Sequence, residues 1–276
     1  MFRGLAHTIA LLAAALLEAS SARAGVLIAP TRLVLQDGER HGEFVLVNKG
    51  GTSERYRVSV VNRRMSAEGR IVEASEAQPG ERFADAMIRF SPREVVLPPD
   101  EPQAIRILVR RPGDLEAGEY RSHLLLMQVP DAPAAAPAPD PGPRRGISAP
   151  VTPIYGITVP IIVRNGRLHA EGALSDLSLR VEHDVPRLHV QIHRAGDRSL
   201  FGDLEVRHEL PGEPTRVVGR ARGVALYTPN QARPFALDLD FPEGRVPTTG
   251  ALRVEYRDAE AGASSLIAEG AVGLTP

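Results

Sequence analysis

Residues 151–165, VTPIYGITVPIIVRN, constrain the fold of this chain most strongly. The segment is a dense apolar run rich in β-branched residues, which favours a β-strand. Alternation divides its side chains between two faces: Val151, Pro153, Tyr155, Ile157, Val159, Ile161 and Val163 on one, and Ile154, Gly156, Thr158, Pro160 and Ile162 on the other. Both faces are largely apolar, and the prolines prevent regular pairing on both edges. We therefore expect a strand at a sheet edge or a strand with a bulge. At an edge, such an apolar strand is either covered by the fold or used by another chain.

The N-terminus has the pattern of a secretory signal peptide over residues 1–24. Arg3 precedes an apolar stretch at residues 9–17, and Ala22-Arg23-Ala24 supplies the small residues of a cleavage site. The apolar stretch is too short to span a bilayer as a mature anchor. A retained N-terminal anchor is the alternative interpretation. We expect an exported protein whose mature chain begins near Gly25.

The rest of the chain is a succession of short alternating segments separated by Gly, Pro and Asp. Strands are expected at 26–35, 43–48, 56–62, 71–72, 87–97, 103–110 and 120–129. A second set is expected at 168–179, 187–193, 203–210, 216–224, 235–239, 252–256 and 265–274. No sustained helical period is present in the mature chain. The predicted fold class is all-β, with two tandem immunoglobulin-like β-sandwich domains.

The position of the apolar strand in this scheme depends on the tract before it. Residues 131–146, DAPAAAPAPDPGPRRG, form a Pro/Ala-rich segment of low complexity that cannot bury a core. If the tract is an interdomain linker, the apolar strand opens the second domain. If it is a long loop, the same strand closes the first domain. Composition leaves both interpretations open.

Composition also argues against several classes of function. The chain has no cysteine, which excludes a disulfide framework, a thiolate metal site and a cysteine nucleophile. A formal net charge of −1 and few aromatic residues argue against a nucleic-acid-binding protein. No phosphate-binding glycine loop or serine nucleophile motif is present. We expect a protein that is not an enzyme and needs no cofactor.

The clearest metal-ligand pattern is the alternation of His189, Gln191 and His193 on one face of a predicted strand. Two imidazoles four residues apart on a strand are separated by about 13 Å, too far to share one ion. A solvated polar face explains the same alternation. We therefore predict no metal site.

Several fragments occur in an order that resembles a known family. They are TRLVL with Thr31 and Arg32, FVLVN ending at Asn48, FSPREVVLPPDEPQAIRI at residues 90–107, Ser122 with its apolar run to Pro130, and the apolar strand that ends at Arg164. Over roughly residues 26–165 the chain resembles the PapD-like periplasmic pilus (fimbrial) assembly chaperones, as a divergent member. Residues 166–276 match only by their strand pattern.

The resemblance implies a boomerang of two immunoglobulin-like domains, at residues 25–165 and 166–276, in a periplasmic protein. Such chaperones bind pilus subunits that have an incomplete immunoglobulin-like fold, lend them a strand by donor-strand complementation, and deliver them to an outer-membrane usher. The lending strand is the last of the first domain, so residues 131–146 would be a mobile loop before it. Lending a strand is β-addition, in which main-chain hydrogen bonds and alternating side chains both contribute.

The resemblance also assigns roles to particular residues. We assign Val151, Tyr155, Ile157 and Val159 as the donor face, although a register shift of one residue would exchange the two faces. Arg32 matches the arginine that anchors the client's C-terminal carboxylate, a task that suits the guanidinium fork. Arg164 matches the arginine of an interdomain ion pair.

The chain departs from the family pattern at two places in this region. A second cleft cation is expected near residues 158–160, where none is present. The carboxylate anchor is therefore either single or completed by another arginine such as Arg106. The glutamate of the strand that holds Ser122 is replaced by Arg121, with Glu119 nearby. The acidic partner of Arg164 is therefore left open.

Two other functions remain as alternatives. An exported tandem immunoglobulin-like binding or adhesion module would lend no strand and would keep residues 131–146 as a true linker. An enzyme with a histidine-built metal site would require histidines brought together by the fold.

Overall fold

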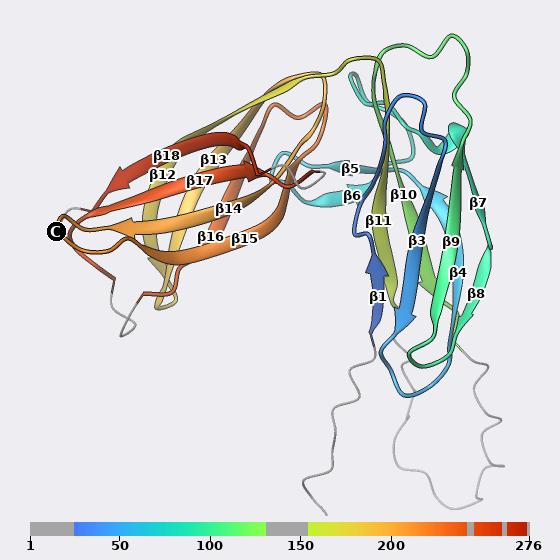
Figure 1. The fold of residues 1–276 in the computed structure, drawn as a ribbon, viewed down its shortest axis with the longest axis horizontal. Coiled ribbons are helices and arrows are strands. Elements are labelled where there is room, and N and C mark those ends of the chain that lie inside the picture. The colour runs from blue at the N-terminus through green and yellow to red at the C-terminus, as the bar shows by residue number, and fades with distance from the viewer. Residues whose placement is uncertain (1–24, 131–153, 242–245, 261–263, 275–276) are drawn as a thin grey trace, which may run out of the picture.

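The computed structural model describes residues 25–130, 154–241, 246–260 and 264–274. The predicted signal peptide, the tract at residues 131–146 and the predicted donor residue Val151 lie outside these ranges. Figure 1 shows two β-sandwiches that meet at one end and diverge like the arms of a boomerang. The predicted all-β fold of two tandem immunoglobulin-like sandwiches is confirmed. No helix in the described ranges is long and apolar enough to cross a membrane.

The first sandwich consists of a four-stranded and a five-stranded sheet. The four-stranded sheet has the order β1 (Val26–Ala29), β3 (His41–Asn48), β9 (Pro102–Val109) and β7 (Ile88–Ser91). The five-stranded sheet has the order β2 (Leu33–Leu35), β11 (Gly156–Asn165), β10 (Gly118–Gln128), β4 (Glu54–Val61) and β8 (Glu94–Leu97). A short 3-10 helix, η1 (Asp85–Met87), precedes β7. Residues 131–153 thus connect β10 and β11, two antiparallel neighbours in one sheet.

The second sandwich consists of a three-stranded and a four-stranded sheet. The first has the order β12 (Ala170–Glu182), β13 (Val185–Gly196) and β16 (Ala232–Asp238). The second has the order β15 (Arg216–Leu226), β14 (Leu200–Glu209), β17 (Ala251–Asp258) and β18 (Leu266–Gly273). Inward residues of the two sheets form the core, with Tyr256, Leu188 and Ile192 fully buried.

The first predicted strand, residues 26–35, is two strands in the structure. β1 pairs with β3 in the four-stranded sheet, whereas β2 pairs with β11 in the five-stranded sheet. The chain crosses between the sheets at residues 30–32. The sequence pattern missed this crossover because Pro30, Thr31 and Arg32 are a short interruption with apolar strand residues on both sides. The crossover brings Arg32 to the joint with the second domain, where it contacts Glu260.

Two motif residues of the first domain have structural roles. Asn48 is fully buried, and its side-chain amide donates to the carbonyls of Thr52 (2.7 Å) and Leu97 (2.8 Å). The Ser122 hydroxyl accepts a hydrogen bond from the Ala84 amide (3.0 Å) and donates to Asn62 (2.6 Å). Both side chains satisfy backbone groups that burial would otherwise leave unpaired.

The joint between the sandwiches is partly apolar. Met65 and Ile162 of the first domain pack in the core cluster of the second, with Val34 against it. The hairpin of β5 (Arg63–Met65) and β6 (Ile71–Glu73) lies between the two arms in Figure 1. Asn230 of the second domain donates to the carbonyls of Met65 (3.0 Å) and Ser66 (3.1 Å) of this hairpin region. Gly166 follows β11 with φ of 80°, a conformation that favours glycine.

Candidate functional site

The two edges of β11 are paired to different extents. β10 pairs with β11 from Gly156 to Asn165, along the whole strand. On the opposite edge β2 pairs in parallel only with residues 161–163. Within the described residues, 156–160 therefore have no strand partner on that edge. An unpaired edge presents backbone donors and acceptors that another strand can satisfy.

The side chains of the predicted donor face are buried to different depths. Tyr155 is 61% exposed, and Ile157 is half-buried against the first core. Val159 is only 6% exposed and belongs to that core, together with Ile161 and Val163. The odd-numbered face thus packs mainly on its own sandwich. Of the predicted donor residues that the structure describes, Tyr155 and Ile157 retain surface for a partner, whereas Val159 retains very little.

The side chains on the opposite face of β11 become less exposed along the strand. Ile154, just before the strand, is 56% exposed, whereas Ile162 is buried at the domain joint. His123 of β10 lies opposite Pro160 and is also buried. Burial, together with the charges of Arg121 and Arg63, lowers the pKa of His123 to about 3. This histidine is therefore neutral at ordinary pH.

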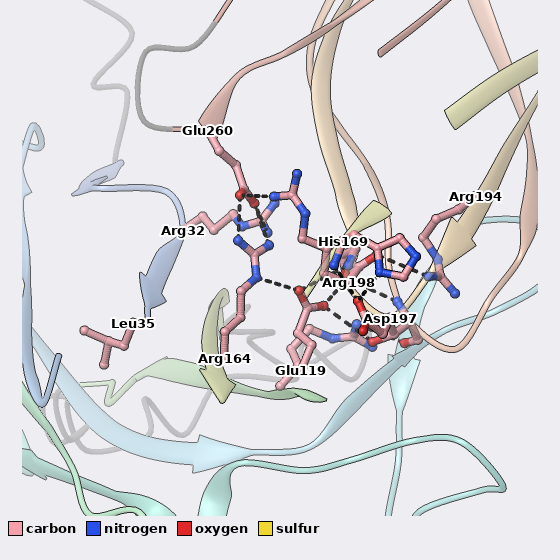
Figure 2. Close-up of polar contacts among 12 residues, drawn as sticks. Arg32, Leu35, Glu119, Arg164, His169, Arg194, Asp197, Arg198 and Glu260 are labelled. Atoms are coloured by element: carbon pink, nitrogen blue, oxygen red, sulfur yellow. Dashed lines mark hydrogen bonds and ion pairs between the residues drawn. The ribbon is translucent and has the colours of Figure 1, made fainter. Parts of the chain in front are cut away.

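Arg164, near the end of β11, joins the two domains through carboxylates on both sides. Its Nε donates to Glu119 on β10 (3.0 Å). Its two Nη atoms donate to Glu260 of the second domain, at 2.7 Å from Nη1 to Oε2 and 2.9 Å from Nη2 to Oε1. Figure 2 shows Arg164 between these two carboxylates. The acidic partners that the sequence left open are thus Glu119 and Glu260.

Glu119 is buried and also holds the second domain directly. It accepts hydrogen bonds from the backbone amide of Ser199 (3.1 Å), from the Ser199 hydroxyl and from the Thr228 hydroxyl (3.4 Å). Arg121, the departure noted in the sequence, does not pair with Arg164 but stacks over the Tyr227 ring at 4.2 Å. Its Nη1 donates to the Thr228 carbonyl (3.2 Å).

Arg32 lies within this interdomain cluster. Its side chain is 5% exposed, and its Nη2 is 2.5 Å from Oε1 of Glu260. Its guanidinium also lies over the Phe201 ring at 4.4 Å, a favourable cation–π arrangement. The contact with Glu260 is an ion pair by distance but lacks hydrogen-bond geometry. Among the described residues, Nε, Nη1 and Nη2 of Arg32 have no hydrogen-bond acceptor.

A third guanidinium meets the same carboxylate. Arg198 Nη1 lies 3.2 Å from Oε2 of Glu260. Arg32, Arg164 and Arg198 therefore share one acidic group at the domain joint (Figure 2). Arg106, suggested from the sequence as the second cation, is exposed on β9 in the other sheet of the first domain. The cation beside Arg32 that the sequence missed comes from the second domain.

Arg194, at the end of β13, supports the loop that carries Arg198. It is buried and donates to the carbonyls of Gly196 (2.8 Å), Arg198 (3.1 Å) and Asn230 (2.9 Å). These bonds tie the β13–β14 and β15–β16 loops together and hold Ser199 against Glu119.

Burial and neighbouring charges shift the pKa values of Glu260 and Arg164. Burial alone would raise the pKa of Glu260, but its hydrogen bonds to Arg164 and the charges of Arg32, Arg164 and Arg198 lower it overall. Burial alone would lower the pKa of Arg164, but Glu260 and Glu119 raise it overall. The ion pairs are thus retained at neutral pH.

The histidines of the predicted polar face bind separate partners. His189 Nε2 lies 2.8 Å from Glu182 Oε1, and His193 Nε2 lies 2.8 Å from the Ser175 hydroxyl. Over the described ranges, no group of three or more His, Asp or Glu side chains could hold a metal ion. These contacts are those of the partly solvated face that alternation predicted.

Comparison with known proteins gave matches only among solved structures, since no family model and no curated protein matches. One match is the chaperone–tip adhesion subunit pre-assembly complex CsuC–CsuE from archaic chaperone-usher Csu pili of Acinetobacter baumannii. The identity is 13% and the TM-score 0.47, over 89% of this chain and 98% of that chain.

Two further matches are crystal structures of chaperones. The E. coli chaperone DraB is 11% identical with a TM-score of 0.45, over 90% of this chain and 96% of that chain. The CupB2 chaperone of Pseudomonas aeruginosa is 14% identical with a TM-score of 0.42, over 91% of this chain and 100% of that chain. Such identities and TM-scores assign no role to any residue. These three alignments cover 89–91% of this chain.

Proposed function

We propose that this protein is a periplasmic chaperone that binds fimbrial or pilus subunits by donor-strand complementation and delivers them for assembly. The observation that carries the proposal is the half-paired edge of β11. A subunit whose immunoglobulin-like fold lacks a strand has its own unpaired edge and an open apolar groove. Pairing the two edges would satisfy backbone groups of both proteins.

The side chains at this edge suit such a partner. Tyr155 and Ile154 are exposed at the open end of β11, and Ile157 is half-buried next to them. Burying an apolar side chain on binding contributes on the order of 1–3 kcal/mol. The proposed donor segment is therefore the free edge at residues 156–160, with Tyr155 and Ile157 as the side chains that a subunit covers.

The position of Arg32 supports its proposed role as carboxylate anchor. Leu33 pairs with Ile161 in the parallel register of β2 and β11. One residue earlier, this register sets Arg32 level with Pro160, where the unpaired edge ends. A guest strand running parallel to β11 along residues 156–160 would therefore have its C-terminus at Arg32. A terminal carboxylate there could take up guanidinium donors that the described residues leave unmet.

Co-purification of subunits from the periplasm tests the function. We expect Arg32→Ala to lose subunit capture while the protein remains folded, and Arg32→Lys to restore it only in part because the fork is absent. Tyr155→Asp should block capture by placing a charge against the subunit groove. Normal capture by Arg32→Ala would overturn the anchoring role, and normal capture by Tyr155→Asp would overturn the donor assignment.

Limited proteolysis separates this function from the tandem binding module that lends no strand. We propose that residues 131–146 are a loop of a first domain at residues 25–165, with residues 166–276 as the second domain. Cleavage in the tract should then leave the two fragments associated, because β10 and β11 are paired on either side of it. Release of two separate domains would support a linker instead. Delivery to an outer-membrane usher is part of the proposal and would appear as usher-dependent release of the subunit.

A further inference from the structure

Glu260 is the one carboxylate on which three guanidinium groups converge within the described residues. Arg32 approaches it from the β1–β2 crossover, Arg164 from β11 and Arg198 from the β13–β14 loop. Arg164 has a second acidic partner in Glu119, and Arg198 has a longer contact of 4.0 Å with Asp258. Arg32 has Glu260 as its acidic contact, so it is the arginine most affected if Glu260 moves.

The contact between Arg32 and Glu260 is incomplete. A buried guanidinium whose donors lack acceptors loses hydration without full compensation. The geometry of Glu260 gives Arg164 two hydrogen bonds and leaves Arg32 with an ion pair alone. A carboxylate placed differently could pair with Arg32 through both oxygens, which is the stronger arrangement.

The carboxylate is also accessible from outside the cluster. A cavity of about 400 Å³ is bordered by Arg198, Phe201 and Glu260, among other residues of the second domain. The Glu260 side chain is 15% exposed, whereas that of Arg164 is 3% exposed. Glu260 thus has more freedom to move than Arg32 (5% exposed) or Arg164. Its backbone amide donates a hydrogen bond to Asp258 (2.7 Å), which does not involve its carboxylate.

We propose that Glu260 is a built-in occupant of the carboxylate site and that the terminal carboxylate of a captured subunit binds by displacing it from Arg32. The proposal rests on the proposed function. The exchange replaces one negative charge by another, so the buried arginines are never left unpaired, which would be costly. The free protein consequently has a closed anchor, and only a partner that delivers a carboxylate to this point opens it.

A small carboxylate tests the occupancy without any subunit. N-acetylglycine carries a free carboxylate after a peptide bond, and N-acetylglycinamide is its uncharged control. Binding can be followed by the NMR signals of the arginine Nε–H groups. We expect Glu260→Gln to bind N-acetylglycine at least about ten-fold more tightly than the unchanged protein, with Arg32 among the perturbed signals. The amide should bind to neither.

Matched variants establish that the gain comes from this site. Glu205 also holds two arginines, Arg207 and Arg220, but on the outer face of the second domain. Glu205→Gln should therefore leave N-acetylglycine binding unchanged, and Arg32→Ala in the Glu260→Gln background should remove the gain. If Glu260→Gln does not fold, Glu260→Asp withdraws the carboxylate while keeping the charge and should show the same direction of change.

The outcomes distinguish this inference from the proposed function. If Glu260→Gln binds no more tightly, or its gain survives Arg32→Ala, the occupancy is wrong even where subunit capture requires Arg32. If the gain depends on Arg32 but subunit capture does not, the occupancy stands and the anchoring role in chaperone function is wrong. Enhanced subunit capture by Glu260→Gln, absent in Glu205→Gln, is the result that supports both.

Discussion

The two halves of β11 show how one apolar run can meet opposite requirements. From residue 161 to residue 164 the strand is paired on one edge along its length and on the other through 163, and every side chain is buried. From residue 156 to residue 160 one edge is unpaired, and Tyr155 just before it is 61% exposed. Residues 156–160 thus keep one edge open, whereas residues 161–164 are buried within the sandwich and at the domain joint. Under the proposed function, the first half would serve binding and the second serves stability.

The largest contrast between the halves should appear when a charge is introduced. Ile161→Asp would bury a carboxylate in the first core, where Ile161 is fully buried. We expect a loss of about 4 kcal/mol or more in unfolding free energy. Tyr155→Asp should change it by no more than about 0.5 kcal/mol. Denaturant titration measures both, and similar midpoints for the two variants would contradict the contrast.

Removal of Arg164, near the C-terminal end of β11, should have the next largest effect on stability. Arg164→Ala leaves Glu119 buried without its guanidinium partner, and breaking a buried pair in this way costs about 3–5 kcal/mol. Arg253→Ala is a matched control, because Arg253 also holds two glutamates but on the outer face of the second domain. We expect the control to leave the denaturation midpoint unchanged.

The pH dependence of stability should show that Glu260 is ionised in the interdomain cluster with Arg32, Arg164 and Arg198. The pKa of Glu260 is lowered below its ordinary value of 4.5 in the folded protein. The unfolded chain therefore takes up the proton first as the pH falls. The stability of the unchanged protein relative to Glu260→Gln should be constant above about pH 5 and decline as the pH falls through the folded pKa of Glu260. A relative stability that rises on acidification would contradict the ion pairs.

The smallest effect on stability should accompany a large effect on binding. Tyr155→Ala removes an exposed side chain, so we expect a change within about 0.5 kcal/mol in unfolding free energy. Capture of subunits should nevertheless fall measurably in co-purification. Val159→Ala is the informative companion, because Val159 is buried and its loss should cost about 1–3 kcal/mol. If Tyr155→Ala destabilises the protein as much as Val159→Ala, the Tyr155 side chain contributes to the folded core and is not free for a partner.

Local sequence signals predicted most of the strands. Alternation and turn residues place β3, β4, β9 and β13 within a few residues of their observed bounds, since side-chain period and turn chemistry are properties of short segments. The crossover at residues 30–32 was missed because it is short and apolar strand residues stand on both sides of it. Pairing with a new sheet is a tertiary choice that the local pattern does not encode.

Only those residues of the interdomain cluster that belong to the first domain were predicted from the sequence. Arg32 and Arg164 were found through a resemblance in motif order, whereas Glu260 and Arg198 lie in loops that carry no motif. These loops meet Arg32 only when two domains pack, so no spacing in the sequence links them. Alternation gave the two faces of β11 but not their depth of burial, which is why Val159 was expected to be available and is buried instead.

The position of the crossover between β1 and β2 also determines the length of the unpaired edge of β11. The point at which the N-terminal segment leaves one sheet and joins the other fixes how far β2 extends along β11, and so fixes the length of the gap beside it. Five residues of open edge correspond to about 17 Å, which is the length of an ordinary strand. A change of residues 30–32 that moved the crossover earlier would shorten this gap without altering β11 itself. Under the proposed function, residues 30–32 would therefore limit the length of the guest strand, although they lie about 130 residues before β11 in the sequence.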